Sequence, residues 1–287
     1  MKPAHTPMAI LERFDRRIRR RGTATLIATA VIALSSSVAP AASAEQPRTP
    51  TFNNIKLASS RPPLTDHGRV YQTNPKIYLV FWHWTSDTHS EKPELISFLK
   101  SVGRTSWLAT VDQYVGQVHP IVMGIWSDNA SIPSHPTSTD MVSESARAAR
   151  HFGLVPDGGV HINAQIVIAL PQHHSANYSI PFVDAGNYCG WHDFFADYPG
   201  YTFWGLPYTW LNYFTDKSCP GIASTAGHEL AESITNPAIW GGWYGSSPAD
   251  EIGDRCNDQY GTLKVNHMIF RVQKLWSNAN KGCVMHP

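Results

Sequence analysis

Hydrophobic residues in the central part of the chain form short runs rich in β-branched and aromatic side chains. These runs predict three strands, at Lys76–Trp84, His119–Trp126 and Gln165–Leu170. Between the strands, apolar positions recur at helical spacing, with turn or cap residues at the ends. The helices predicted on this basis are Lys92–Val102, Ser106–Tyr114 and Thr139–Phe152.

The second half of the chain has a different pattern. Residues 171–218 are rich in loop-forming residues and aromatics, and no element is predicted there. A helix is predicted for Pro220–Asn236, because proline suits a first helical turn and Pro237 follows the last one. The tail from Gly261 to Val284 predicts a hairpin or a pair of strands. Together these elements indicate an α/β fold, a single domain with a mixed central sheet flanked by helices.

The first 44 residues have the composition of a secretory signal. A cluster of arginines between residues 13 and 21 precedes an apolar run, Ala24–Leu34, which is too short to span a bilayer. Small residues follow and end in Ala42-Ser43-Ala44, the A-x-A pattern of a cleavage site. We therefore expect a mature chain that begins near Glu45 and is secreted, to an extracellular or periplasmic location. Residues 45–70, rich in Pro, Thr, Arg and Ser, predict a poorly ordered lead-in to one secreted domain over 71–287.

Removal of the signal changes the net charge of the protein. The full chain has 23 basic and 22 acidic side chains, and residues 1–44 hold seven of the basic and two of the acidic ones. The mature chain thus has 16 basic and 20 acidic side chains, a net charge of 16 − 20 = −4. A nucleic-acid-binding protein needs a basic surface, so that class is disfavoured. No second apolar run is long enough to span a membrane, and we expect a monomer.

All four cysteines lie in the mature chain. An even number of cysteines in an exported protein indicates disulfides, and four cysteines allow three pairings. We expect the two local pairs, Cys189–Cys219 and Cys256–Cys283. A zinc cluster of four cysteines is disfavoured, because the sequence has no C-x-x-C motif.

The sequence His228-Glu229-Leu230-Ala231-Glu232 carries the most specific chemical pattern. Residues four apart share one face of a helix, so His228 and Glu232 would project side by side as two metal ligands. This H-E-x-x-E spacing corresponds to the zincin-like H-E-x-x-H helix of zinc peptidases with its second histidine replaced by glutamate. Glu229 would then be the general base that activates a water molecule. A solvated helical His–Glu pair has the same spacing, so further ligands are needed.

Three residues outside the helix are candidates for the third ligand. Glu251 and Asp254 follow the helix by about 20 residues, and His192 lies three residues after Cys189, which the expected disulfide ties near the helix. Zinc is the expected ion. Calcium or another divalent ion remains open, because each carboxylate makes the site harder and less positive.

Taken in order, these motifs resemble the EXORDIUM or phosphate-induced protein family and its bacterial secreted relatives. The resemblance rests on Cys-Gly-x-His at Cys189–His192, the H-E-L-A-E segment, its Thr-Asn-Pro end and Glu-Ile-Gly-Asp-x-Cys at Glu251–Cys256. It covers roughly residues 187–284 and implies an extracytoplasmic protein that, in plants, is associated with the cell wall and with growth responses. It also implies His192, Glu251 and Asp254 as partners of His228 and Glu232 in a metal site.

Two functional classes follow from this pattern. The first is a secreted metal-dependent hydrolase of peptidase type, with Glu229 as its catalytic residue. The second is a non-catalytic extracellular binding or signalling protein. Its ten tryptophans, several in Gly- and Tyr-rich segments, would stack on a peptide or a cell-wall glycan.

Overall fold

The structure, a computed structural model, describes residues 61–68, 71–154, 161–176, 188–195, 206–213, 219–238 and 241–287. Residues Ala58–Pro287 form one compact unit. The predicted signal and most of the predicted lead-in lie outside the described residues. The order of elements is β1 Thr65–Asp66, β2 Lys76–Trp82, α2 Glu91–Ser101, η1 Val102–Arg104, η2 Leu108–Val111, α3 Asp112–Val115, β3 Ile121–Asp128, α4 Ser138–His151, β4 Ala164–Ala169, β5 Gly190–Phe195, β6 Leu206–Leu211, α5 Ile222–Thr235, β7 Trp243–Tyr244, η3 Asp254–Cys256, β8 Tyr260–Val265, β9 Met268–Gln273, β10 Leu275–Ser277 and β11 Gly282–Val284.

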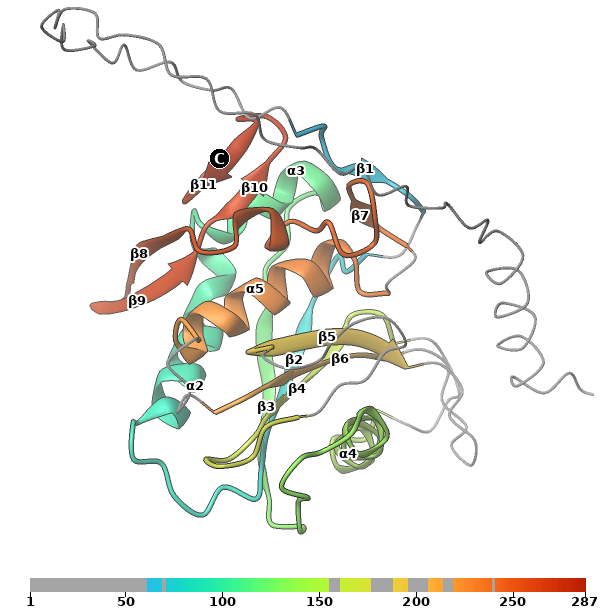
Figure 1. Cartoon of the computed structure of the whole chain (residues 1–287), viewed down its shortest axis with the longest axis vertical. Helices are drawn as coiled ribbons and strands as arrows, with labels where there is room; N and C mark the ends of the chain where they lie inside the picture. The colour runs from blue at the N-terminus through green and yellow to red at the C-terminus, as the bar shows by residue number, and fades with distance from the viewer. Residues whose placement is uncertain are drawn as a thin grey trace, which may run out of the picture. The chain divides into compact units, whose positions relative to one another are not determined.

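A five-stranded mixed sheet lies at the centre of this unit, in the order β3-β2-β4-β6-β5 (Figure 1). Strands β3, β2, β4 and β6 are parallel, and β5 pairs antiparallel with β6. The prediction of a mixed α/β fold is confirmed. The predicted Ser106–Tyr114 helix is instead split into the 3₁₀ turn η2 and the short α3.

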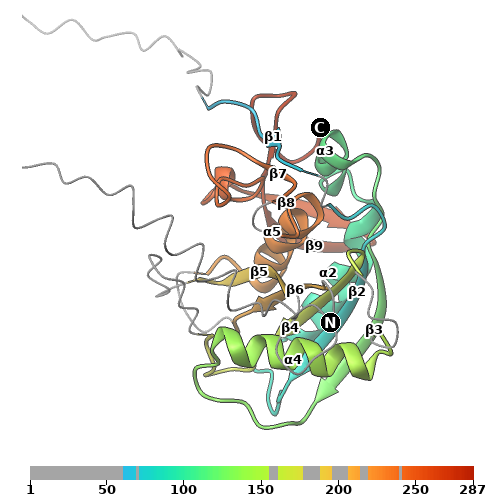
Figure 2. The same ribbon diagram turned by 90° about the vertical axis from the view of Figure 1, so that its right-hand side faces the viewer.

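Helices cover both faces of the sheet (Figures 1 and 2). Alternate residues of β2 point to opposite faces, as the period of a strand requires. Leu79 and Phe81 join one hydrophobic core with α2 and α5, whereas Val80 and Trp82 join a second core with α4. The sheet thus separates an α2/α5 layer from an α4 layer.

Strands β5 and β6 were not predicted, since both fall within 171–218, for which the sequence indicated loops. Every residue of β6 is buried, including Tyr208 and Trp210, and Pro207 interrupts the expected strand pattern. Pro207 lies opposite Phe194 of β5, and the pairing with β4 begins only at Tyr208, so proline stands where β4 offers it no paired residue. β5 carries His192, one of the candidate ligands.

The chain beyond α5 packs back against that helix. Strands β8 and β9 form the predicted hairpin, and β10 pairs with β11. Before the sheet, Thr65 and Asp66 of β1 pair with β7, and Leu64 is buried, so ordered structure begins ahead of the boundary expected at residue 71. None of the described helices is long and apolar enough to cross a membrane.

Both predicted disulfides are present. Cys189 is bonded to Cys219 and Cys256 to Cys283. The first joins the chain just before β5 to the chain just before α5. The second ties η3 to β11. Helix α5 is therefore flanked by two covalently fixed segments.

Candidate metal centre

Helix α5 places three ionisable side chains in a buried position. The helix has small residues on one side, and Gly227 lets Trp107 and Phe98 approach its backbone, so α5 packs closely against its neighbours. Glu229 and Glu232 are buried, and the side chain of His228 is 15 % exposed. Such carboxylates are costly to bury unless they are paired or bind a cation.

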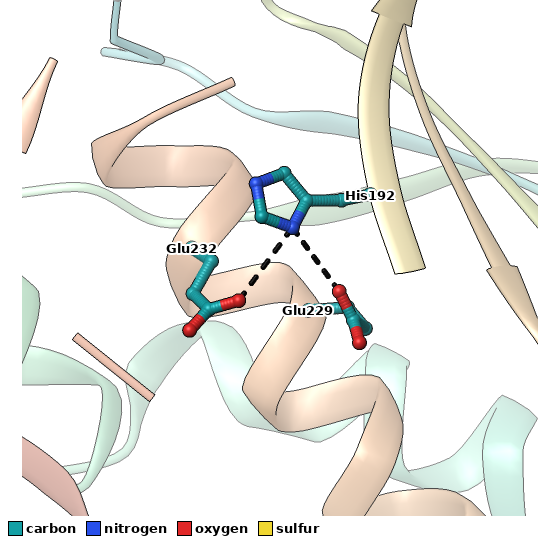
Figure 3. Close-up of side chains that lie close together, drawn as sticks. All are labelled: His192, Glu229 and Glu232. Atoms are coloured by element: carbon teal, nitrogen blue, oxygen red, sulfur yellow. Dashed lines mark hydrogen bonds and ion pairs between the residues drawn. The ribbon is translucent and has the colours of Figure 1, made fainter. Parts of the chain in front are cut away.

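His192 reaches this face of the helix from β5. Its Nδ1 lies 3.1 Å from Glu229 Oε2 and 3.6 Å from Glu232 Oε2. Figure 3 shows the imidazole placed between these two carboxylates. Gly190, two residues earlier on β5, permits this approach, because a Cβ there would lie 3.0 Å from Glu229 Oε1 and 2.7 Å from Thr225 Cγ2.

His228 forms a second group with the same glutamate. Its Nε2 lies 3.0 Å from Glu232 Oε2 and 3.7 Å from Asp254 Oδ1. Two sets of three potential ligands therefore share Glu232: His192, Glu229 and Glu232, and His228, Glu232 and Asp254. Asp254, whose side chain is 33 % exposed, is the outermost of these ligands.

The turn before η3 is fixed by the other oxygen of Glu232. Glu232 Oε1 accepts hydrogen bonds from the backbone N–H groups of Gly253, at 3.1 Å, and Asp254, at 3.0 Å. A Cβ on Gly253 would lie only 2.7 Å from His228 Nδ1 and 2.8 Å from Glu232 Oε1, so glycine is required for this close contact. Gln273 Nε2 donates to the Gly253 carbonyl and holds the turn from β9.

Glu251 closes the group on the side of His192. Its Oε1 lies 3.5 Å from His192 Nε2 and accepts a 2.7 Å hydrogen bond from Asn236 Nδ2. The carbonyl of Asn236 lies 3.2 Å from His192 Nε2. The sequence analysis did not name Asn236 as a site residue. The available signal was its position as the last residue of the predicted helix, directly before Pro237.

The electrostatics of this cluster are dominated by its four carboxylates. Burial, together with Glu232, raises the pKa of Asp254 to about 8 and that of Glu251 to about 7. Burial alone would lower the pKa of both histidines, but the neighbouring carboxylates raise it well above its ordinary value. Burial raises the pKa of Glu232, but His228 outweighs this effect and lowers it. The carboxylates thus favour protonated imidazoles, and burial favours protonation of Asp254 and Glu251.

The spacing of the donor atoms suits a divalent cation. A tetrahedral ion with ligands at about 2.0–2.2 Å separates those ligands from one another by about 3.3–3.6 Å. The separations around Glu232 Oε2 and His192 Nδ1 span 3.0–3.6 Å. The six residues proposed from the sequence lie in one cluster, although Glu251 contacts His192 and belongs to neither group of three ligands. A positive ion would offset the negative charge of the carboxylates.

A scan against models of known protein families found no match. Among curated proteins, the chain is similar to Protein EXORDIUM-like 5 of Arabidopsis thaliana, with 28% identity over 246 residues. The match covers 68% of this chain and 64% of the relative, so the chain spans less than two thirds of the length of that protein. This similarity confirms the EXORDIUM-like resemblance expected from the motifs. With the two disulfides, it is consistent with an extracellular location.

Proposed function

Because this chain is a homologue of an EXORDIUM-like protein, we propose that it is a non-catalytic extracellular binding protein built around one divalent cation. The observation that carries the cation is that the buried Glu232 belongs to two groups of three potential ligands, one with His192 and Glu229 and one with His228 and Asp254. The cation would join α5, β5 and the turn before η3, which hydrogen bonds of Glu232, Asn236 and His192 already link. Its role in this proposal is to hold the fold, and the partner is a peptide or a cell-wall glycan.

Zinc is the ion that the donor set favours. Imidazole nitrogen suits zinc and related transition metals, whereas calcium takes oxygen ligands almost exclusively. His192 and His228 both present nitrogen toward Glu232 Oε2, and the remaining groups supply carboxylate oxygen. Calcium binding would require both imidazoles to stay outside the coordination sphere.

Metal analysis of the purified mature protein tests this proposal. After gel filtration, elemental analysis should find about one zinc ion per chain, since a structural site with this donor set binds tightly. His228→Ala and Glu232→Gln should lose the ion. His151→Ala, which removes an exposed imidazole stacked on Trp126, is the matched control and should keep it. Absence of bound metal after incubation with zinc, calcium and manganese would rule the proposal out.

A hydrolase remains the second candidate, and one observation favours it. Glu229 belongs to the group of His192 and not to the group of His228, Glu232 and Asp254. If the second group holds the ion, Glu229 is left beside it as a carboxylate that binds no metal. Asp254 and His228 are partly exposed, so solvent reaches the cluster from their side. A bound zinc ion would supply Lewis-acid chemistry there. Glu229 would hold a proton removed from water.

Glu229→Gln separates the two candidates. This substitution keeps the size of the side chain and removes its basicity. For a hydrolase, cleavage of casein and of chromogenic ester substrates by the zinc-loaded protein should fall at least about 100-fold. For a binding protein, the zinc-loaded wild type should have no activity above the zinc-free protein, and Glu229→Gln should leave its folding intact.

A further inference from the structure

The two groups of potential ligands that share Glu232 do not merge into one. Within each group the donor atoms lie within 4.8 Å of one another, and among the described residues no donor of one group joins the other group as a fourth member. The pair of His192 and Glu229 therefore marks a position for an ion of its own, beside the position that His228 and Asp254 mark.

The surroundings of His192 leave one of its ring nitrogens available to a cation. Its Nε2 faces two acceptors, the carbonyl of Asn236 at 3.2 Å and Glu251 Oε1 at 3.5 Å, so this nitrogen carries a proton. Metal-bound histidines are commonly held in this way, with one nitrogen donating to a carbonyl or carboxylate and the other bound to the ion. Asn236 Nδ2 in turn donates to Glu251 and holds that carboxylate in place. His192 Nδ1 is thus the nitrogen that can bind metal.

This nitrogen points between two carboxylates of α5 (Figure 3). It lies 3.1 Å from Glu229 Oε2 and 3.6 Å from Glu232 Oε2, close to the separation of about 3.3–3.6 Å between the ligands of a tetrahedral zinc ion. The side chains of His192, Glu229 and Glu232 are only 9 %, 6 % and 3 % exposed. Water therefore cannot fully solvate their charges, and a cation among them would offset this cost.

Glu232 can serve both positions through one oxygen. Its Oε1 is used by the backbone N–H groups of Gly253 and Asp254. Its Oε2 faces both imidazoles, His192 Nδ1 at 3.6 Å and His228 Nε2 at 3.0 Å. An oxygen that lies about 2.0–2.2 Å from each of two ions lets them stand about 3.5–4 Å apart, the usual separation in two-metal sites. The geometry thus accommodates two ions with Oε2 between them.

The charge of the cluster exceeds what one ion can balance. Four carboxylates contribute, those of Glu229, Glu232, Glu251 and Asp254. One divalent cation offsets half of their charge when all are ionised. Arg255, the nearest basic residue along the chain, is engaged with Asp250 instead. A second divalent cation would neutralise the remaining half, which is costly to leave buried.

We propose that the cluster binds a second divalent cation, held by His192, Glu229 and Glu232. The first ion then lies in the group of His228 and Asp254, and Glu232 Oε2 bridges the two. This proposal rests on the proposed function, because both ions need the same buried glutamate. It makes Glu229 a ligand, in place of the proton acceptor that it would be in a hydrolase with one ion.

The number of bound ions tests the second position. The mature, disulfide-bonded protein is depleted of metal with a chelator and titrated with zinc, and native mass spectrometry counts the ions. Two ions per chain should bind, the second at least about tenfold more weakly, because the first repels it at short range. With cobalt(II) in place of zinc, electron paramagnetic resonance should show magnetic coupling between the two ions, since they share one oxygen atom.

Variants assign the second ion to its ligands. His192→Ala and Glu229→Gln should each bind one ion only and leave the affinity for the first ion nearly unchanged. Glu229→Gln keeps the size of the side chain, so the test stays valid if His192→Ala folds poorly. Asp258→Asn is the matched control and should bind two ions, because Asp258 is exposed and asparagine tolerates its φ of 64°.

The outcomes separate this proposal from the proposed function. A single ion at saturating zinc would overturn the second position and leave the proposed function in place, whereas no ion at all would overturn both. Two ions bound to Glu229→Gln and His192→Ala with wild-type affinities would place the second ion elsewhere and overturn the assignment. Two cobalt ions without magnetic coupling would also overturn it, because they would not share the oxygen of Glu232.

Discussion

Gly253 shows how a single residue without a side chain allows the acidic cluster to form. Its backbone N–H donates to Glu232, and its Cα lies so close to His228 that no Cβ fits. Glycine next to the candidate ligand Asp254 is thus part of the geometry of the cluster. Its neighbour Ile252, fully buried, anchors the same turn in the hydrophobic core.

Gly253→Ala should destabilise the protein by about 1–3 kcal/mol, because the added methyl must displace His228 or Glu232 in a packed interior. Urea unfolding followed by fluorescence measures this change. Gly282→Ala is the control, since a Cβ there meets nothing closer than the Asn280 carbonyl at 3.8 Å. Equal unfolding midpoints of the two variants would contradict the close contact described for Gly253.

The residues of the cluster were predictable to different degrees. His228, Glu229 and Glu232 follow from helical spacing, and His192 follows from the expected disulfide that places Cys189 near α5. Asn236 contributes a backbone carbonyl and an amide whose partners come from β5 and the turn, and no sequence pattern specifies such contacts. Gly190 and Gly253 are equally dependent on tertiary contacts.

At the scale of elements, the short helix α3 is joined to the C-terminal strands through Tyr114. Its hydroxyl donates to the Trp276 carbonyl, at 2.9 Å, and accepts from the backbone N–H of Asn278, at 3.1 Å. Burial raises the pKa of the Tyr114 phenol, which therefore stays neutral in the folded protein at pH values that ionise it in the unfolded chain. This difference makes the contact pH-dependent.

Tyr114→Phe should lower the free energy of unfolding by about 1–2 kcal/mol at pH 7, because two buried backbone groups lose a partner. The pKa of the Tyr114 phenol is higher in the folded protein than in the unfolded chain, where it is about 10. The stability that this difference contributes is therefore fully present below pH 10 and is lost as the pH rises above it. The difference between wild type and variant should therefore shrink as pH rises beyond 10. Urea unfolding at pH 7, 9 and 11 measures it, with the exposed Tyr188→Phe as control. A difference that grows with pH would contradict the assignment.

The elements themselves were predicted unevenly from the sequence. Strands β2, β3 and β4 and helices α2, α4 and α5 follow from period and caps, although the structure places the cap of α4 at Thr137, two residues before the predicted start of that helix. Strands β5 and β6 were missed because tertiary contacts determine them more than local pattern does: β6 is buried along its whole length between β4 and β5, and β5 packs against α5. The order of the strands likewise depends on tertiary packing.

At the scale of the whole molecule, the acidic cluster lies in the α5 layer on one face of the central sheet. The two disulfides join the segments that flank α5, so both covalent cross-links lie around the cluster. Disulfide formation requires an oxidising compartment, which agrees with the predicted signal.

Export of the chain should remove residues 1–44, so that the secreted protein begins at Glu45. Intact-mass spectrometry and N-terminal sequencing of material from a secreting host measure the cleavage site. Ala42→Asp, at an outer position of the A-x-A pattern, should leave the precursor uncut, whereas Ser43→Ala, at its variable position, should be processed normally. Detection of the full-length chain in the medium for the wild type would refute the prediction.

The two oxygens of Glu232 bear on how this protein can evolve. One oxygen holds the turn before η3, and the other faces both imidazoles. A shorter or uncharged residue at this position would alter the backbone of the turn and the candidate ligand set together. Substitutions of Glu229 are expected to change the cluster while leaving the turn in place, whereas a change at position 232 requires the whole turn to be rebuilt.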